Sequence, residues 1–203
     1  MNIKTLVLGQ LLTNCYLVWD EETKEAIAID PADEADYIIR KILDEKLVVK
    51  FIVATHGHFD HVLGLLELKL AFNAPFLMNS KDNFLLKRTS QTTKRFTGLS
   101  ADPTPFPDNN LQQGNKIIFG KQTLKVIETP GHTPGGISLS TPGILFSGDM
   151  IFADGFGRTD LSYSSPIDFQ KSLTKLFKLP DSTIIYPGHG LTTSVKKAKL
   201  MIE

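Results

Sequence analysis

The stretch VATHGHFDHVLG, from Val53 to Gly64, places three histidines and an aspartate within six residues. These residues are His56, His58, Asp60 and His61. They follow the β-branched run VVKFIVAT, which is typical of a buried strand. The whole chain has 5 histidines, so a cluster of three at the end of one strand predicts a metal site rather than an accident of composition.

The two remaining histidines lie in turns that resemble each other. His132 occurs in TPGHTPG and His189 in YPGHG, and each follows a strand pattern and a Pro-Gly pair. A Pro-Gly pair forms a tight turn that lifts the next side chain clear of the sheet edge. All five histidines therefore come just after expected strands, where layered α/β proteins place their ligand sites.

The side chains in these positions suit a divalent metal. Imidazole nitrogen and carboxylate oxygen, without a thiolate, are ligands for zinc, iron or manganese. In an extended segment, His56, His58 and Asp60 would share one side while His61 faces away, which indicates two ions side by side. Two ions need a bridging carboxylate, and Asp149 follows the strand GILFSGD in a suitable place. The alternative for Asp149 is a helix or turn cap.

Composition gives a broad frame for this site. The chain has 203 residues with Lys+Arg 22 and Asp+Glu 22, so its formal net charge is zero. We expect a single domain over residues 1–203 with a small-molecule substrate, because nothing here favours nucleic acid or a membrane. Cys15 is the only cysteine, which rules out an intramolecular disulfide and favours a reducing, cytoplasmic compartment. We expect Cys15 to be buried structure.

Strand and helix patterns alternate along the chain. Strands are expected in the first thirty residues, at 48–55, in a run of short antiparallel strands over 116–149, and at 182–187. Helices are expected at 32–46, 61–72, 165–179 and 194–203. The polar middle, 79–115, is expected to hold a Pro-rich loop and a short helix over 80–88.

The motifs THGHFDH, TPGHTPGG, FSGD and YPGHG, in this order, resemble those of the metallo-β-lactamase fold superfamily. Within it the chain is most similar to glyoxalase II-like hydrolases, that is, hydroxyacylglutathione hydrolase-like enzymes. The resemblance implies an α+β fold, a four-layer αββα sandwich of two mixed β-sheets flanked by helices, with the site at one edge. The chain given ends soon after His189, so the C-terminal helical domain of glyoxalase II is expected to be missing.

The same resemblance implies a ligand set and a reaction. One metal would be held by His56, His58 and His132, the second by Asp60, His61 and His189, with Asp149 bridging and Asp30 supporting the site from behind. The expected cofactors are two divalent ions per chain, zinc in the first place, with iron or manganese as alternatives. A metal-bridging hydroxide would attack a thioester carbonyl, and Asp60 would also orient the hydroxide or accept its proton.

Other members of the superfamily leave alternatives open. The GRTD stretch resembles persulfide dioxygenases, in which one iron would be held by His56, His132 and Asp149. A lactonase on the same fold is a further alternative. Activity on β-lactams is not expected, because the chain has His61 and no cysteine ligand. Arg158 matches a residue that contacts the glutathione carboxylate, or it forms an ion pair with Asp154 or Asp160.

Overall fold

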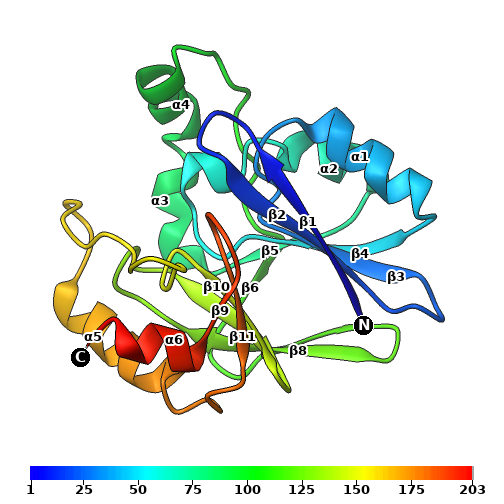
Figure 1. Cartoon of the computed structure of the whole chain (residues 1–203). Helices are drawn as coiled ribbons and strands as arrows, with labels where there is room; N and C mark the ends of the chain where they lie inside the picture. Colours follow the sequence, from blue (N-terminus) through cyan, green and yellow to red (C-terminus); the bar gives the residue numbers. More distant parts are fainter. Residues whose placement is uncertain (203) are drawn as a thin grey trace.

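Two six-stranded sheets form the centre of the structure, a computed structural model that describes residues 1–202. The first sheet has the order β1-β2-β3-β4-β5-β6 and the second the order β12-β11-β10-β9-β8-β7. Each sheet contains both parallel and antiparallel pairs, so both are mixed. Helices lie on the outer side of each sheet (Figure 1). The expected α+β fold of two mixed sheets flanked by helices is confirmed.

The chain builds most of the first sheet, then the helices of the middle, then the last short strand of the first sheet and finally the second sheet. The first sheet contains β1 (Asn2–Leu8), β2 (Thr13–Trp19), β3 (Glu25–Ile29), β4 (Val48–Val53), β5 (Phe76–Met78) and β6 (Asn109–Asn110). The second contains β7 (Lys116–Phe119), β8 (Gln122–Glu128), β9 (Ile137–Thr141), β10 (Ile144–Gly148), β11 (Ile184–Pro187) and β12 (Thr193–Ser194). The helices are α1 (Ala35–Asp44), α2 (Leu65–Phe72), α3 (Asn83–Leu86), α4 (Thr89–Thr97), α5 (Pro166–Leu176) and α6 (Val195–Leu200), with short 3-10 turns η1 (Phe59–His61) and η2 (Ser80–Asp82).

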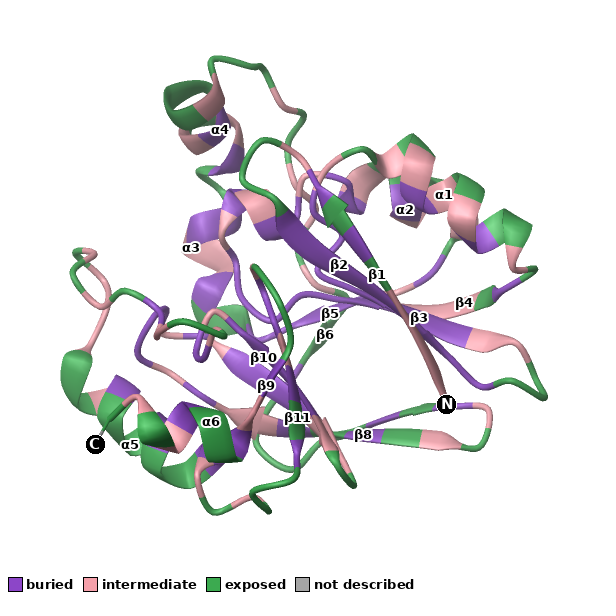
Figure 2. Ribbon diagram, viewed as in Figure 1, coloured by how far each residue is buried: buried purple, intermediate pink, exposed green. Residues whose placement is uncertain are grey.

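Three apolar clusters separate the four layers. One lies between α1, α2 and the first sheet, a second between the two sheets, and a third between the second sheet and α5 with α6. Strand β2 is buried at every position, because apolar side chains cover it on both faces. The buried residues in Figure 2 accordingly follow the strands, while exposed residues follow the outer helix faces.

The sequence patterns located most elements, but they missed one helix and the short strands β5, β6 and β12. The helix expected from His61 begins only at Leu65, because Phe59–His61 form the separate turn η1. Helix α4 was not expected, since TSQTTKRFT is polar and buries only Thr89 and Thr93. A helix that buries two threonines lacks the apolar repeat by which helices are recognised. None of the helices within residues 1–202 is long and apolar enough to cross a bilayer.

Strand β2 ties the two sheets together beside the turn that carries His189. The Asn14 side-chain amide donates to the carbonyls of Pro187 and Gly190, both at 2.9 Å. The Tyr16 hydroxyl donates to the same Pro187 carbonyl at 2.5 Å. The Asn14 backbone N–H donates to the Gly188 carbonyl at 2.7 Å. The first sheet therefore fixes the position of a turn that belongs to the second.

We predict that Asn14→Ala lowers the free energy of unfolding by about 1–3 kcal/mol, because the substitution removes two side-chain hydrogen bonds between the sheets, to the carbonyls of Pro187 and Gly190. Chemical denaturation monitored by circular dichroism measures this change. Asn109→Ala, at an exposed position of β6, is the matched control and should leave the unfolding midpoint unchanged. Equal stability of the two variants would contradict this role of Asn14.

Candidate metal centre

The ends of five strands meet at one edge of the two sheets. Asp30 follows β3, His56 lies shortly after β4, His132 follows β8, Asp149 follows β10 and His189 follows β11. The first two strands belong to the first sheet and the other three to the second. The site therefore draws its side chains from both sheets, as the strand-end positions of the histidines indicated.

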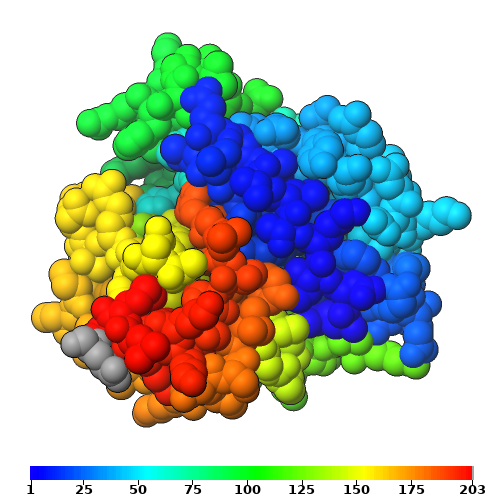
Figure 3. Space-filling view, viewed as in Figure 1, coloured from blue at the N-terminus to red at the C-terminus, as the bar shows by residue number. Residues whose placement is uncertain are grey.

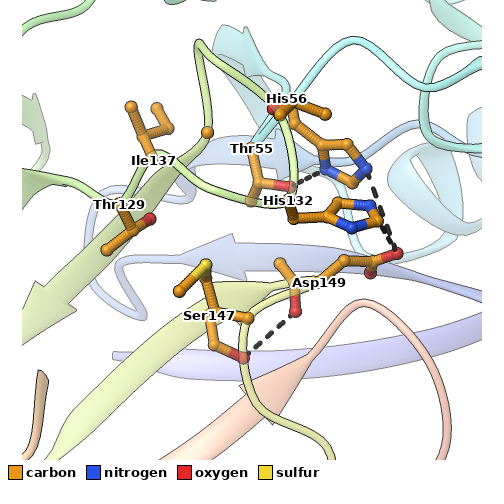
Figure 4. Close-up of a pocket in the computed structure, with 11 residues that line it drawn as sticks. Thr55, His56, Thr129, His132, Ile137, Ser147 and Asp149 are labelled. Carbon is orange, nitrogen blue, oxygen red and sulfur yellow. Dashed lines mark hydrogen bonds and ion pairs between the residues drawn. The ribbon is translucent and has the colours of Figure 1, made fainter. Parts of the chain in front are cut away.

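Seven of the residues singled out in the sequence form two adjoining groups. The first group is His56, His58, His132 and Asp149, and the second is Asp60, His61 and His189. Within each group, one potential ligand atom per residue lies within 4.8 Å of the others. Figure 4 shows the rings of His56 and His132 side by side, turned toward the Asp149 carboxylate.

The Asp149 carboxylate lies between the groups. Its Oδ2 atom is 3.6 Å from Nε2 of His132 and also 3.6 Å from Nε2 of His189. Its Oδ1 atom is 3.4 Å from Nε2 of His61. One carboxylate thus faces both groups, which is the geometry that a bridging ligand requires.

Residues 56–61 are not extended throughout, contrary to the expectation from the sequence, because they contain the 3-10 turn η1. An extended segment would place Asp60 with His56 and His58, but Phe59–His61 form a 3-10 turn instead. The Asp60 carboxylate consequently joins the second group, where its Oδ2 is 3.5 Å from Nε2 of His61 and 3.3 Å from Nε2 of His189. The turn lets two neighbouring residues, Asp60 and His61, point to the same place.

Each histidine ring is held by a hydrogen bond on the nitrogen that faces away from the site. Nδ1 of His61 donates to Asp30 at 3.1 Å, and Nδ1 of His132 donates to the Arg158 carbonyl at 2.8 Å. Nδ1 of His189 donates to the Leu11 carbonyl at 3.0 Å. With the proton on this nitrogen, a neutral ring turns the lone pair of Nε2 inward.

The other two histidines follow the same rule through hydroxyl groups. The Thr55 hydroxyl donates to Asp30 Oδ2 at 2.8 Å, so it accepts from Nδ1 of His56 at 3.1 Å. Nε2 of His58 bonds to the Tyr163 hydroxyl at 2.8 Å, which leaves its Nδ1 facing inward.

The inward-facing atoms have the spacing of ligands around an ion. Nδ1 of His58 lies 3.0 Å from Nε2 of His56 and 3.0 Å from Nε2 of His132. When the outer nitrogens carry the protons, these pairs are lone pairs facing each other, an arrangement that a cation would stabilise. Donor atoms around a tetrahedral zinc with bonds of about 2.0–2.1 Å lie roughly 3.3 Å apart. Nε2 of His61 and Oδ1 of Asp149 are moreover buried without a hydrogen-bond partner.

The imidazoles fall into two sets according to whether their surroundings lower or raise the pKa of the ring. Burial lowers the pKa of His58 to about 3, and it lowers the pKa of His56 well below the ordinary value. Burial acts in the same direction on His61 and His189, but nearby carboxylates raise the pKa of both rings. The imidazoles in turn lower the pKa of Asp60 and Asp149 despite their burial, so both carboxylates are ionised at neutral pH.

Gly188 leaves room for the centre. A Cβ atom at this position would overlap Oδ1 of Asp149 and lie 2.7 Å from Cε1 of His61. Real Cβ atoms do not approach other heavy atoms so closely, so any side chain here would displace a member of each group. The glycine of YPGHG is therefore required by the space next to Asp149, beyond its use in the turn.

The sequence model of the Metallo-beta-lactamase superfamily matches residues 8–189, a range that contains all seven of these residues. The chain belongs to the metallo-beta-lactamase superfamily. Its relatives include the hydroxyacylglutathione hydrolase GloC of Haemophilus influenzae, 35% identical over 98% of this chain and 95% of the relative. Membership of the superfamily and the name of this relative support the interpretation of the chain as a metal-dependent hydrolase.

Two solved structures resemble this one over nearly their whole length. BLEG-1, described as a B3 metallo-beta-lactamase, has a TM-score of 0.89 and 31% identity, with 97% of this chain and 95% of that chain covered. TTHA1623 in a di-iron-bound form has a TM-score of 0.87 and 32% identity, with 96% of each chain covered.

Several residues that shape the centre escaped the sequence patterns. Tyr163 and Thr55 hold His58 and His56 through their hydroxyl groups. Thr13 donates to Oδ2 of Asp60 at 3.0 Å. Buried Asp82 accepts from the backbone N–H of Gly57 at 3.0 Å and of Gly135 at 2.6 Å, so it joins the loops of His58 and His132. Common polar residues in loops carry no signal that marks them.

Two further expectations have clear outcomes. Arg158 forms a two-bond ion pair with Asp160, from Nε to Oδ1 at 2.8 Å and from one terminal nitrogen to Oδ2 at 2.9 Å. The structure therefore shows the ion-pair alternative, with both side chains exposed. Cys15 is fully buried in the first apolar cluster, and burial raises the pKa of its thiol.

We predict that Gly188→Ala weakens metal binding by at least about tenfold, because the added methyl group displaces Asp149. Metal content per chain after dialysis against a weak chelator measures the effect, and circular dichroism checks that the fold is kept. Gly155→Ala is the matched control, since a Cβ at Gly155 meets no other atom within 4 Å. Full metal content in Gly188→Ala would contradict the placement of Asp149 as a ligand.

Proposed function

We propose that this protein is a dinuclear metal-dependent hydrolase of thioesters, similar in activity to hydroxyacylglutathione hydrolases. The observation that carries the proposal is the convergence of seven ligand-type side chains into two adjoining groups with Asp149 between them. The name of the Haemophilus influenzae relative supports the thioester substrate.

In this proposal the first ion is held by His56, His58 and His132 and the second by Asp60, His61 and His189. Asp149 bridges the two, and Asp30 holds His61 from behind. When bound, such a pair of ions supplies a water that ionises near neutral pH and positive charge for a developing oxyanion. Because the ligands come from both sheets, we further propose that residues 1–203 act as one domain.

Asp60 is proposed to orient the attacking water in addition to its role as a ligand. Its carboxylate is fixed by the Thr13 hydroxyl and lies 3.3 Å from Nε2 of His189. The neighbouring imidazoles lower its pKa, so it stays ionised and can accept a hydrogen bond from water. A carboxylate of low pKa is a weak base, which favours orientation over lasting acceptance of the proton.

The donor atoms fit more than one metal. Imidazoles and carboxylates without thiolates suit zinc, iron and manganese. Zinc is our first choice because it is commonly bound by several imidazoles, whereas TTHA1623 was observed with two irons. Metal analysis of the purified protein distinguishes these possibilities.

The alternatives make different demands on the same residues. A one-iron oxygenase would use His56, His132 and Asp149 and would leave Asp60, His61 and His189 without an ion. The presence of the complete second group favours hydrolysis by two ions. Hydrolysis of β-lactams is the second candidate, because BLEG-1 is described as a B3 metallo-beta-lactamase at 31% identity.

We predict that freshly purified protein contains two divalent ions per chain and hydrolyses S-lactoylglutathione faster than a β-lactam or a lactone. His58→Ala should lower thioester hydrolysis by about 100-fold or more, since the loss of partners behind ligands alone costs about 10–100-fold. Mass spectrometry of the metals, thioester absorbance and circular dichroism provide the measurements. One iron per chain with oxygen consumption on glutathione persulfide would instead support the oxygenase.

We predict that the second group releases its ion first as pH falls. The pKa of His61 and of His189 is raised, so at mildly acidic pH protons compete with the ion for these rings. The pKa of His56 and of His58 is lowered, so these rings stay neutral. Dialysis at about pH 5.5 should leave one ion per chain, and dialysis at about pH 7.5 should leave two. Loss of both ions together would argue against two groups of unlike basicity.

A further inference from the structure

A cavity of about 100 Å³ lies directly beside the candidate metal centre. We propose that it binds an anionic group of the substrate, a carboxylate, through Arg88, so that Arg88 sets a preference for acidic thioesters. This inference rests on the proposed thioester hydrolysis and adds to it the chemical class of the substrate. It assigns a binding role to the helical segment α3–α4, which lies between β5 and β6 in the chain.

The cavity is continuous with the first group of ligands. His58 and Tyr163 line it, and the bond between Nε2 of His58 and the Tyr163 hydroxyl is 2.8 Å. Leu85 and Phe59 form apolar parts of its wall. A molecule in this cavity is therefore in contact with a residue that is itself proposed to bind an ion.

Arg88 lies where α3 ends and α4 begins, and its side chain also lines the cavity. Its guanidinium carbon is 5.8 Å from the centre of the Phe84 ring, and the Phe84 ring contacts the Tyr163 ring edge-on at 5.3 Å. The aromatic pair thus joins Arg88 to the loop that holds His58. In Figure 3 the green helical segment and the yellow segment after β10 lie next to each other on one face.

The guanidinium of Arg88 has no carboxylate partner within residues 1–202: none of the ion pairs or side-chain hydrogen bonds there includes it. A guanidinium with its donors unused can bind a carboxylate through two parallel hydrogen bonds. Arg88 is exposed, so its guanidinium is accessible to a ligand that enters the cavity from solvent.

Arg158, the arginine that the family resemblance suggested for this role, is already paired. Both oxygens of Asp160 accept hydrogen bonds from its guanidinium, at 2.8 Å and 2.9 Å. A substrate carboxylate would have to displace Asp160 to reach it. Arg88 requires no such displacement, which makes it the better candidate for the anionic group.

The test compares three thioesters with the same acyl group: S-lactoylglutathione, its diethyl ester, and S-lactoyl-N-acetylcysteamine, which has no carboxylate. Arg88→Ala should lower kcat/KM for the diacid by about 10- to 100-fold, mainly through KM, since a charged hydrogen bond contributes about 1.5–3 kcal/mol. The two thioesters without a carboxylate should change by less than about twofold. Arg88→Lys should recover part of the loss.

Lys87→Ala, at an exposed position next to Arg88, is the matched control and should treat the diacid as the wild type does. Arg158→Ala tests the competing arginine, and it should show no loss that is selective for the diacid. Equal losses on all three thioesters, or no loss on the diacid, would overturn the assignment of Arg88. A loss in Arg158→Ala alone would assign the carboxylate to Arg158 instead.

A binding measurement separates this inference from the proposed reaction. Calorimetry with S-hexylglutathione, a thioether that cannot be hydrolysed, should show about tenfold weaker binding to metal-loaded Arg88→Ala than to the wild type. If the wild type hydrolyses none of the three thioesters, the proposed reaction fails, and the calorimetry still decides the role of Arg88. Absence of binding to the wild type, or equal binding to both proteins, would overturn the anion site.

Discussion

Five hydrogen bonds on the outer nitrogens of five imidazoles are the constraint on which the candidate centre depends. An imidazole that donates its only proton outward must present a lone pair inward. The partners are two backbone carbonyls, a carboxylate and two hydroxyl groups, and they come from several segments of the chain. The centre therefore exists only when these segments are all in place.

The two sheets have to be held at a fixed distance for the same reason. Asp149 follows a strand of the second sheet, but it faces His56 and His61, which follow a strand of the first. The bonds from Asn14 and Tyr16 to the Pro187 carbonyl cross from one sheet to the other within two residues of His189. The apolar cluster between the sheets and these polar bonds together set the spacing of the ligands.

The sequence predicted the strand-end positions of the candidate ligands well, because strands follow from local apolar patterns and their ends follow from Pro-Gly turns. His132 and His189 are of this kind. The position of Asp60 depends on a 3-10 turn, which a short run of His, Phe and Asp does not reveal. The roles of Tyr163 and Asp82 could not be predicted from the sequence. Each is a single polar residue in a loop, and its role depends on contacts with residues that are distant along the chain.

The contrast between Arg158 and Arg88 follows from the same difference. Metal ligands are constrained by bond lengths, so a matching motif carries its ligands from one member of a superfamily to another. Substrate contacts depend on loops and short helices, where one neighbouring residue changes the outcome. Here Arg158 forms an ion pair with Asp160, while α3 and α4 bring Arg88 to the cavity beside His58. The two arginines approach the candidate centre from different segments of the chain. The arginine proposed to bind a substrate carboxylate can therefore differ between members of the superfamily that share the same metal-binding motifs.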